Sequence, residues 1–443
     1  MTIYTPSLED IRSLASGDHP DGPGPTRRDA LRMFAGAASA GLVSALAGDA
    51  LGAPKASSAK KKPRAKACIV LWLNGGPSHI DSFDPKPKHA NGGKLKAIKT
   101  RIAGAQFTAP LERLAEQAHK LAVIRSMSSK EGNHVRARYL VHTGYSPTPT
   151  VQHPSLGGWV ASQLGDKKAA LPAFVSIAGP SVSAGFLGVQ HGPFVISSVK
   201  DPLANVRTPA FVPDSREDRR LSLLHHLEKG FQERQQDPKV DGRVSVYGQA
   251  VRLMRSEDLV AFDLSAEPEK VVKLYGDSDF GRGALMARKL VQGGVKLVEV
   301  TLDGFDTHKD GFTRLEKQLG ILDLALSGLL TDLTEHKMLD DTLVLCLGEF
   351  GRTPHINADD GRDHYPQAWS AVLAGGGIKG GTLYGSTDEE GAKVDKPVSV
   401  PDLLATATTL LGLQPDDTFP TPGGRPIAIT DQGVALSAIM KPA

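Results

Sequence analysis

Three short segments of the sequence carry carboxylate or imidazole side chains close to glycine. DGFDTHKD holds Asp306 and His308, GEFGRT holds Glu349, and GRDHY holds His364. Imidazole nitrogens and carboxylate oxygens bind divalent metal ions, which they must approach to within about 2.0 to 2.6 Å. Because the segments are far apart along the chain, they predict a metal site only if the fold brings them to one place.

The first two segments each follow directly on an apolar run that is typical of a buried strand, and GRDHY comes soon after the second. Runs of this kind, bounded by Gly or Asp, occur at 68–73, 121–124, 173–177, 295–301, 342–347 and 370–373. They lack polar alternation, which indicates strands covered on both faces. Helical stretches between them occupy 111–119, 156–164, 217–234, 284–292, 312–333 and 401–411.

This alternation of strand and helix predicts an α/β fold, a three-layer sandwich with a mostly parallel central sheet. The stretch 200–274 differs, because it is rich in charge and poor in strands. We expect it to be a helical insertion over one end of the sheet. Ligands of such sheets bind where the strands end at their carboxyl edges, so the predicted metal site lies at this edge.

Further polar residues are expected at the same edge. The first apolar run continues into NGGPSHIDSFD, which holds Asn74, His79 and Asp81. Arg352 and Asp363 lie within GEFGRT and GRDHY. Structural roles stay open for these residues, since a histidine or aspartate after a strand also caps loops and helices, and an arginine also forms structural salt bridges.

The longer motifs resemble a known family. IVLWLNGGPSHIDSFDPKP, GFDTH, LGEFGRTP and GRDHYPQAWSAVLAGGGIKGG resemble the sulfatase-like exported family known as domain of unknown function 1501, which is similar to the alkaline phosphatase superfamily. The resemblance covers the chain from about Lys66 to the C-terminus. It implies an alkaline-phosphatase/sulfatase-like fold, a two-part metal site and a nucleophile that attacks phosphorus or sulfur.

The resemblance also implies roles for single residues. Asn74 and Glu349 stand where the superfamily has aspartates, and Phe350 replaces a histidine, so this half of the site should bind its ion weakly or not at all. The other half, Asp/His/His, is intact. The implied cofactor is a divalent ion, with zinc, calcium and manganese not distinguished. The implied metal ligands are Asn74, Asp306, His308, Glu349 and His364. The positions after the strands, and not the resemblance, predict the further pocket residues His79, Asp81, Arg352 and Asp363.

His134 and Arg138 fall on catalytic positions of the sulfatase pattern. The stretch from His134 to Arg138 precedes Thr143-Gly144 as the sulfatase nucleophile segment precedes its own Thr-Gly pair. In this register His134 takes the place of the nucleophile and Arg138 that of the arginine that steadies it. Because no Ser, Thr or Cys stands there, His134 is left as a nucleophile, a general acid or base, or a further ligand.

Two functions from different classes fit these residues. The first is a metal-dependent hydrolase of sulfate or phosphate esters, with an anionic ester or a sulfated glycan of extracellular polysaccharide as substrate. The second is a catalytically degenerate protein that binds a glycan or a protein partner without turnover, since the usual nucleophile is missing. We favour the hydrolase because of its ligand-rich strand ends, and a purely structural ion is a third alternative.

The N-terminal segment predicts export. TRRDALRMF at 26–34 places Arg27 and Arg28 ahead of a weakly apolar run that ends at Ala47, which is the twin-arginine pattern. The run is shorter than the about 18 residues that cross a bilayer, so we expect no transmembrane span. We predict a twin-arginine signal peptide over 1–53, read by the twin-arginine export machinery, a basic linker over 54–66, and a sulfatase-like domain over 67–443 that is periplasmic or extracellular.

The charge distribution argues against a nucleic-acid partner. The chain has 52 basic and 49 acidic residues, a formal net charge of +3. Six of the basic residues lie in the linker, KASSAKKKPRAK, so the folded body is close to neutral.

The two cysteines are predicted to be core residues. Cys68 and Cys346 each lie inside a short apolar run rich in β-branched residues. Such a position favours a small buried thiol over a disulfide.

Overall fold

The computed structural model describes residues 62–442 apart from 204–205, 207–212 and 236. The predicted signal peptide and most of the predicted linker lie outside the described residues. Within the described residues, no helix combines the length and the apolar character that crossing a membrane requires.

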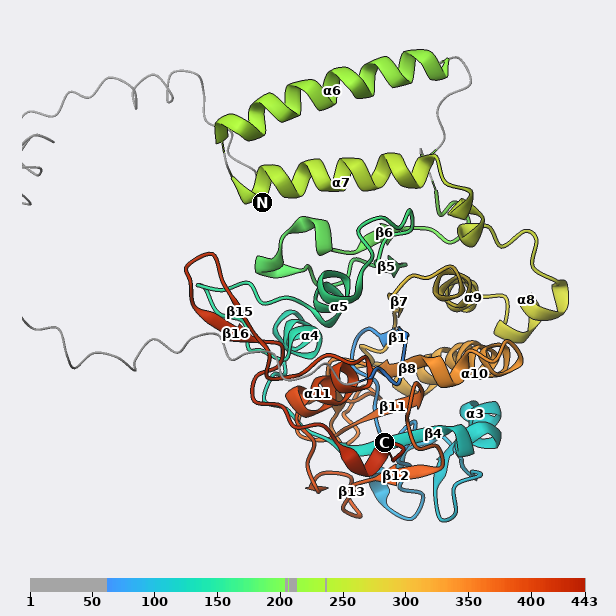
Figure 1. Cartoon of the computed structure of the whole chain (residues 1–443). Helices are drawn as coiled ribbons and strands as arrows, with labels where there is room; N and C mark the ends of the chain where they lie inside the picture. The colour runs from blue at the N-terminus through green and yellow to red at the C-terminus, as the bar shows by residue number, and fades with distance from the viewer. Residues whose placement is uncertain (1–61, 204–205, 207–212, 236, 443) are drawn as a thin grey trace, which may run out of the picture. The chain divides into compact units, whose positions relative to one another are not determined.

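An eight-stranded sheet forms the centre of the described domain (Figure 1). Its order is β12-β4-β11-β8-β1-β7-β5-β6, and β11 alone runs antiparallel to its neighbours. The predicted α/β fold with a mostly parallel central sheet is therefore confirmed. The strands are β1 (Ala67–Leu73), β4 (Leu121–Met127), β5 (Phe174–Ile177), β6 (Phe194–Ile196), β7 (Leu297–Leu302), β8 (Thr342–Leu347), β11 (Trp369–Gly375) and β12 (Thr382–Tyr384).

Helices cover both faces of the sheet, as the uninterrupted apolar strands predict. In β1, Ile69 and Leu71 pack into one core cluster, whereas Val70 and Trp72 pack into the other. This division follows from the two-residue period of a strand, which points successive side chains to opposite faces. The first cluster includes α3 (Glu112–Gln117), α9 (Asp279–Gln292) and α10 (Gly311–Glu335), and the second includes α4 (His134–Thr143), α5 (Leu156–Leu164) and α11 (Val400–Leu410).

The described part of the stretch 200–274 is helical and contains no strand. It holds α6 (Asp214–Gln235), α7 (Pro238–Met254), a short 3₁₀ helix (Glu257–Phe262) and most of α8 (Glu269–Tyr275). The helices α6 and α7 form a hairpin, and α7 contacts the 3₁₀ helix Val189–His191 that precedes β6 (Figure 1).

Small two-stranded pairs lie outside the main sheet, and one of them belongs to the site. β9 (Gly351–Arg352) pairs antiparallel with β10 (His364–Tyr365), with Arg352 opposite His364. The other pairs are β2 (Ala97–Lys99) with β3 (Gln106–Thr108), β13 (Ser386–Thr387) with β14 (Val394–Asp395), and β15 (Thr418–Pro420) with β16 (Pro426–Ala428).

Both cysteines are buried and unpaired, which confirms the prediction. Cys68 lies in β1 and Cys346 in the neighbouring strand β8, where Cys68 is opposite Leu343 and Cys346 is opposite Leu71. Burial raises the pKa of each thiol far above its usual value.

Candidate metal centre

The loops after β1, β7 and β8 meet at the carboxyl edge of the sheet. The loop after β1 turns at Gly75 and Gly76, which have positive φ values of 113° and 77°. A Cβ atom on Gly75 would lie 2.3 Å from the backbone nitrogen of Asp306. Only glycine therefore permits this close approach of the loop after β1 to the loop after β7.

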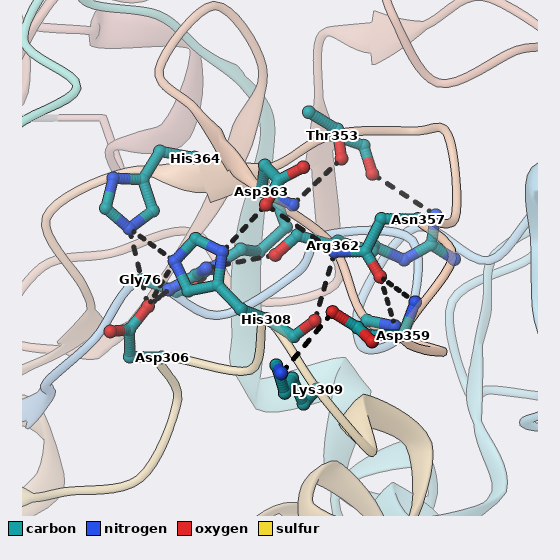
Figure 2. Close-up of polar contacts among 12 residues, drawn as sticks. Gly76, Asp306, His308, Lys309, Thr353, Asn357, Asp359, Arg362, Asp363 and His364 are labelled. Carbon is teal, nitrogen blue, oxygen red and sulfur yellow. Dashed lines mark hydrogen bonds and ion pairs between the residues drawn. The ribbon is translucent and has the colours of Figure 1, made fainter.

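Three histidines from different elements converge on one carboxylate oxygen at this edge. Asp306 Oδ1 lies 3.0 Å from His308 Nε2, 3.3 Å from His364 Nε2 and 3.5 Å from His134 Nε2. The Nε2 atoms of His308 and His364 are only 3.1 Å apart (Figure 2). We call these four residues, His134, Asp306, His308 and His364, the histidine cluster.

Each histidine of the cluster is held at its other ring nitrogen by an acceptor. His134 Nδ1 lies 2.7 Å from Glu349 Oε1, His308 Nδ1 2.7 Å from Asp363 Oδ1, and His364 Nδ1 2.8 Å from the carbonyl oxygen of Gly132. An acceptor at Nδ1 holds the proton of a neutral imidazole there and leaves the lone pair on Nε2. The three Nε2 atoms all lie within 3.5 Å of Asp306 Oδ1, and an acceptor at Nδ1 is how metal-binding histidines are held in proteins.

Phe350 fixes the orientation of two of the rings. Its buried ring lies 4.9 Å from the ring of His134 and 4.6 Å from that of His364, measured between centroids. The rings of His134 and His364 lie 4.4 Å apart, edge to face. Phe350 is thus a packing surface for the imidazoles.

Arg352 ties the cluster to the surrounding loops. Its side chain is fully buried and donates to the carbonyl oxygens of Gly75, Gly76 and Arg362. It also donates to Asp306 Oδ1 at 2.5 Å. Partial burial alone would raise the pKa of Asp306, but the Arg352 guanidinium outweighs it and lowers this pKa from 3.8 to about 2. Asp306 is therefore a carboxylate at neutral pH.

The ring environments differ in their effect on proton binding. The hydrogen bond to the Glu349 carboxylate raises the pKa of His134, and partial burial lowers the pKa of His364. The hydrogen bond from His308 lowers the pKa of Asp363. The carboxylate partner of His308 is therefore charged, which strengthens that imidazole as a donor toward a metal ion.

Solvent reaches the cluster from one side. The side chains of its four residues are between 26 and 49% exposed. Arg352 and Phe350 close the inner side. A bound ion would therefore be held from within the protein and remain open to a small molecule from outside.

The structure separates the predicted site residues into groups. Asp306, His308 and His364, predicted as ligands, lie together, and His134, predicted as a catalytic residue, lies with them. The ligand atoms of His134, Asp306 and His364 all lie within 4.8 Å of one another. Glu349 instead accepts hydrogen bonds from His134 and from the Gly75 N–H at 2.9 Å, and its Oε2 is buried without a partner.

Asn74 and Arg138 make contacts outside the cluster. The Asn74 amide donates to Asp303 Oδ1 at 2.7 Å and accepts from the Trp72 indole at 3.2 Å. The Arg138 guanidinium donates to the carbonyl oxygen of Pro180. Neither side chain hydrogen-bonds to the four residues of the cluster.

Asp81 and His79 lie in the supporting structure. Asp81 forms a buried two-point ion pair with Arg362, at 2.6 and 3.0 Å, which joins the loop after β1 to the segment that leads into β10. The buried His79 ring contacts the carbonyl oxygen of Gly391 at 2.8 Å, and burial lowers its pKa. These contacts position loops and do not reach the cluster.

Sequence reasoning missed the contributions of Gly132 and Arg362. Gly132 acts through a backbone carbonyl, which no side-chain pattern reveals. Arg362 precedes Asp363 in GRDHY, and its burial follows only from the pairing with Asp81. An arginine directly before the candidate pocket residue Asp363 is the one sequence signal that could have indicated this role.

Solved structures resemble the chain distantly. The lipoteichoic acid synthase LtaP from Listeria monocytogenes is 10% identical, with a TM-score of 0.36 and coverage of 83% of this chain and 75% of that chain. The phosphonate monoester hydrolase SpPMH from Silicibacter pomeroyi is 10% identical, with a TM-score of 0.37 and coverage of 84 and 76%. The PsFucS1 sulfatase from Pseudoalteromonas sp. is 13% identical, with a TM-score of 0.34 and coverage of 80 and 68%. At these TM-scores the likenesses support no argument about activity.

A comparison with curated protein sequences gives no match. A family match, in contrast, extends over residues 65–440, and the family is DUF1501, described as "Protein of unknown function". This range contains every residue of the histidine cluster. The chain therefore belongs to the DUF1501 family.

Proposed function

We propose that the protein is a metal-dependent hydrolase of sulfate or phosphate esters. The observation that carries the proposal is the convergence of the three imidazoles, each held by an acceptor at Nδ1 and each with its Nε2 within 3.5 Å of Asp306 Oδ1. Without a cation, this arrangement places two ring nitrogens 3.1 Å apart beside a carboxylate. A metal ion at their common point would satisfy all four side chains.

The donor set favours a transition-metal ion. Imidazole nitrogens suit Zn²⁺, Fe²⁺ and related ions, whereas Mg²⁺ and Ca²⁺ prefer sites built from oxygen. The cluster and its partners contain the carboxylates of Asp306, Glu349 and Asp363 and one guanidinium, that of Arg352. A divalent cation would balance their formal charges. Of the ions that the sequence left open, zinc fits this donor set best.

The surroundings of the site suit an anionic substrate. A bound divalent ion would supply a Lewis acid for an ester oxygen and would lower the pKa of a coordinated water toward about 7. His134 is the first residue of α4, so the positive end of the helix dipole also lies here. Arg138 lies one turn further along α4. Both features favour a sulfate or phosphate group near the cluster.

The reaction would proceed without a covalent intermediate on oxygen or sulfur. Among the described residues, no Ser, Thr or Cys side chain hydrogen-bonds to the histidine cluster. If His134 is a ligand, its Nε2 cannot also attack the ester. The nucleophile would then be water.

The same observation favours a second candidate function, binding of a sulfated glycan or of a protein without turnover. In that case the histidine cluster would hold a metal ion that helps to bind the glycan or the protein. None of its residues would attack an ester or donate a proton to it. Both functions would operate outside the cytoplasm if the predicted twin-arginine leader is used.

The two functions are separated by assaying purified protein with Zn²⁺, Mn²⁺ or Ca²⁺ on p-nitrophenyl sulfate and p-nitrophenyl phosphate. For a hydrolase we expect cleavage with one of the first two ions and a loss of about 100-fold or more in His308→Ala and His364→Ala. His119→Ala is the matched control, because His119 is exposed in the 3₁₀ turn after α3 and outside the cluster. Metal binding without cleavage of either ester would favour the binding protein, and absence of both would overturn the proposal.

A further inference from the structure

Three polar residues of α4 share one face of the helix. His134, Arg138 and His142 follow one another at intervals of four residues, which places them in one row along the helix. The row spans about 12 Å at a rise of 1.5 Å per residue. His134 belongs to the histidine cluster, whereas His142 lies two turns deeper in the protein.

His142 forms an ion pair with a glutamate inside the sheet. Its Nε2 lies 3.1 Å from Glu299 Oε2, and its Nδ1 lies 2.8 Å from the carbonyl oxygen of Arg138. Glu299 lies in the middle of β7, opposite Val70 of β1 and Ser176 of β5. His142 is 7% exposed and Glu299 is 2% exposed.

The surroundings of this pair are apolar. Leu297, Leu345 and Leu404 line the same small cavity, and the ring of Trp72 lies 4.4 Å from that of His142. A buried charge is expensive unless it is paired, and a paired one is often no more stable than well-packed apolar side chains. Stability alone therefore does not explain a charged pair at this position.

The pair belongs to a set of polar contacts that fix the rotation of α4. Ser181, in the loop after β5, donates to Glu299 Oε2 at 2.8 Å, and Arg138 donates to the neighbouring Pro180 carbonyl oxygen. The helix has a narrow apolar contact with the core, and its Val135 is 79% exposed. Directional hydrogen bonds define the angle of a helix about its axis more sharply than a narrow apolar stripe.

We propose that the buried Glu299–His142 pair is the positioning device of the metal centre. The pair holds α4 at the rotation in which His134 Nε2 lies 3.5 Å from Asp306 Oδ1. Glu299 and His142 thus act through His134 and do not touch the ion. The inference rests on the metal centre that the proposed function uses, but not on ester hydrolysis.

Cobalt binding tests this role, because the visible absorption of Co²⁺ reports both its affinity and its ligand geometry. In Glu299→Gln we expect Co²⁺ affinity to fall by about 10-fold to 100-fold, the effect usual for residues that orient metal ligands. We also expect the absorption bands to change. In a His134→Ala background, Glu299→Gln should cause no further loss, since no ligand on α4 is left to position.

Two further variants separate positioning from stability. Asp332→Asn is the matched control, because Asp332 is a buried carboxylate paired with Arg288 away from the cluster. It should lower the melting temperature without changing Co²⁺ affinity. The double variant Glu299→Met/His142→Leu replaces the pair with apolar side chains, so circular dichroism should show that it remains folded. Its Co²⁺ affinity should nevertheless be lower than that of the wild type.

The outcomes distinguish this inference from the proposed function. If the wild-type protein binds Co²⁺ and the folded variants at Glu299 bind it equally well, the positioning role is wrong and the metal centre stands. A loss of affinity that persists in the His134→Ala background would also contradict it. If the wild-type protein binds no Co²⁺, both the metal centre and the positioning role are wrong.

Discussion

Arg352 keeps Asp306 ionised down to low pH. The guanidinium is buried and hydrogen-bonded on three sides to backbone carbonyls, so it cannot move away from the carboxylate when the pH changes. It keeps the pKa of Asp306 at about 2, below the usual value of 3.8. Asp306 is thereby available as an anionic donor under all physiological conditions.

This pair gives a pH dependence of stability in the metal-free protein. The pKa of Asp306 is lower in the folded protein than in the unfolded one. The stabilisation of the folded protein by the charged carboxylate is therefore complete above about pH 4 and is lost as the pH falls toward about 2. We expect the difference in unfolding free energy between wild type and Asp306→Asn to shrink over that range, as measured by urea denaturation. In an Arg352→Met background the difference should lose this dependence, and a persistent dependence would contradict the role of Arg352.

The types of the residues that follow strands predicted part of the cluster. Which of these residues belong to it depends on the direction of each side chain. Asp306 and His308 could be found because a parallel sheet gathers the residues after its strands at one edge. Glu349 also comes after a strand, but its oxygen accepts from His134 and the Gly75 N–H. Asn74 likewise follows a strand, but its side chain pairs with Asp303. Loop backbone geometry sets these directions, and the sequence pattern does not contain it.

At the scale of single elements, α4 matters most for the site, and the sequence analysis did not predict it as a helix. Its ten residues have little apolar periodicity, because one face carries His134, Arg138 and His142. The clear local signal is Asn133, whose side chain accepts hydrogen bonds from the N–H groups of Val135 and Arg136. This cap fixes the residue at which the helix begins.

Removing the cap should weaken metal binding as well as stability. We expect Asn133→Ala to lower the unfolding free energy by about 1 kcal/mol and to reduce Co²⁺ affinity several-fold, because His134 is the first helical residue. Ser399→Ala removes the equivalent cap of α11 and should lower stability alike without changing affinity. Equal affinities for the two variants in a Co²⁺ titration would contradict this account of α4.

The ionisation of Glu299, the buried carboxylate of β7, should make the unfolding free energy depend on pH in acid. Burial alone would raise the pKa of Glu299, but His142, Ser181 and the more distant charge of Arg138 together lower it below 4.5. The stabilising contribution of the charged form is therefore complete above about pH 4.5 and lost as the pH falls through the folded pKa. It should amount to about 3 kcal/mol at neutral pH, the effect usual for breaking a buried pair.

Urea denaturation of wild type and Glu299→Gln at several pH values measures this contribution. We expect the gap in unfolding free energy to be constant near neutral pH and to narrow below about pH 4.5. A gap that widens on acidification would show that Glu299 is not ionised in the folded protein.

The element types that the sequence predicted well are those with the strongest patterns. The six apolar runs all became strands of the central sheet, since burial on both faces requires continuous apolar residues. The strands β6 and β12 were missed. They are three residues long and lie at the two edges of the sheet, where half-burial leaves a weak pattern.

At the scale of the whole molecule, the proposed ion would connect α4 with the loops after β7 and β8. A ligand that binds only the folded state stabilises it by about 2.7 kcal/mol at a concentration 100 times the Kd. We therefore expect Zn²⁺ to raise the melting temperature by a few degrees and a chelator to reverse the rise. His364→Ala should abolish the effect in differential scanning calorimetry, and His119→Ala should retain it.

The central claim is that the histidine cluster binds one metal ion. X-ray diffraction from crystals grown with Zn²⁺, recorded on both sides of the zinc absorption edge, tests it most directly. We expect a single anomalous peak at this edge of the sheet, about 2.0 to 2.2 Å from the Nε2 atoms of His134, His308 and His364 and from Asp306 Oδ1. A map with no peak among these four side chains, or with the ion bound elsewhere, would contradict the claim.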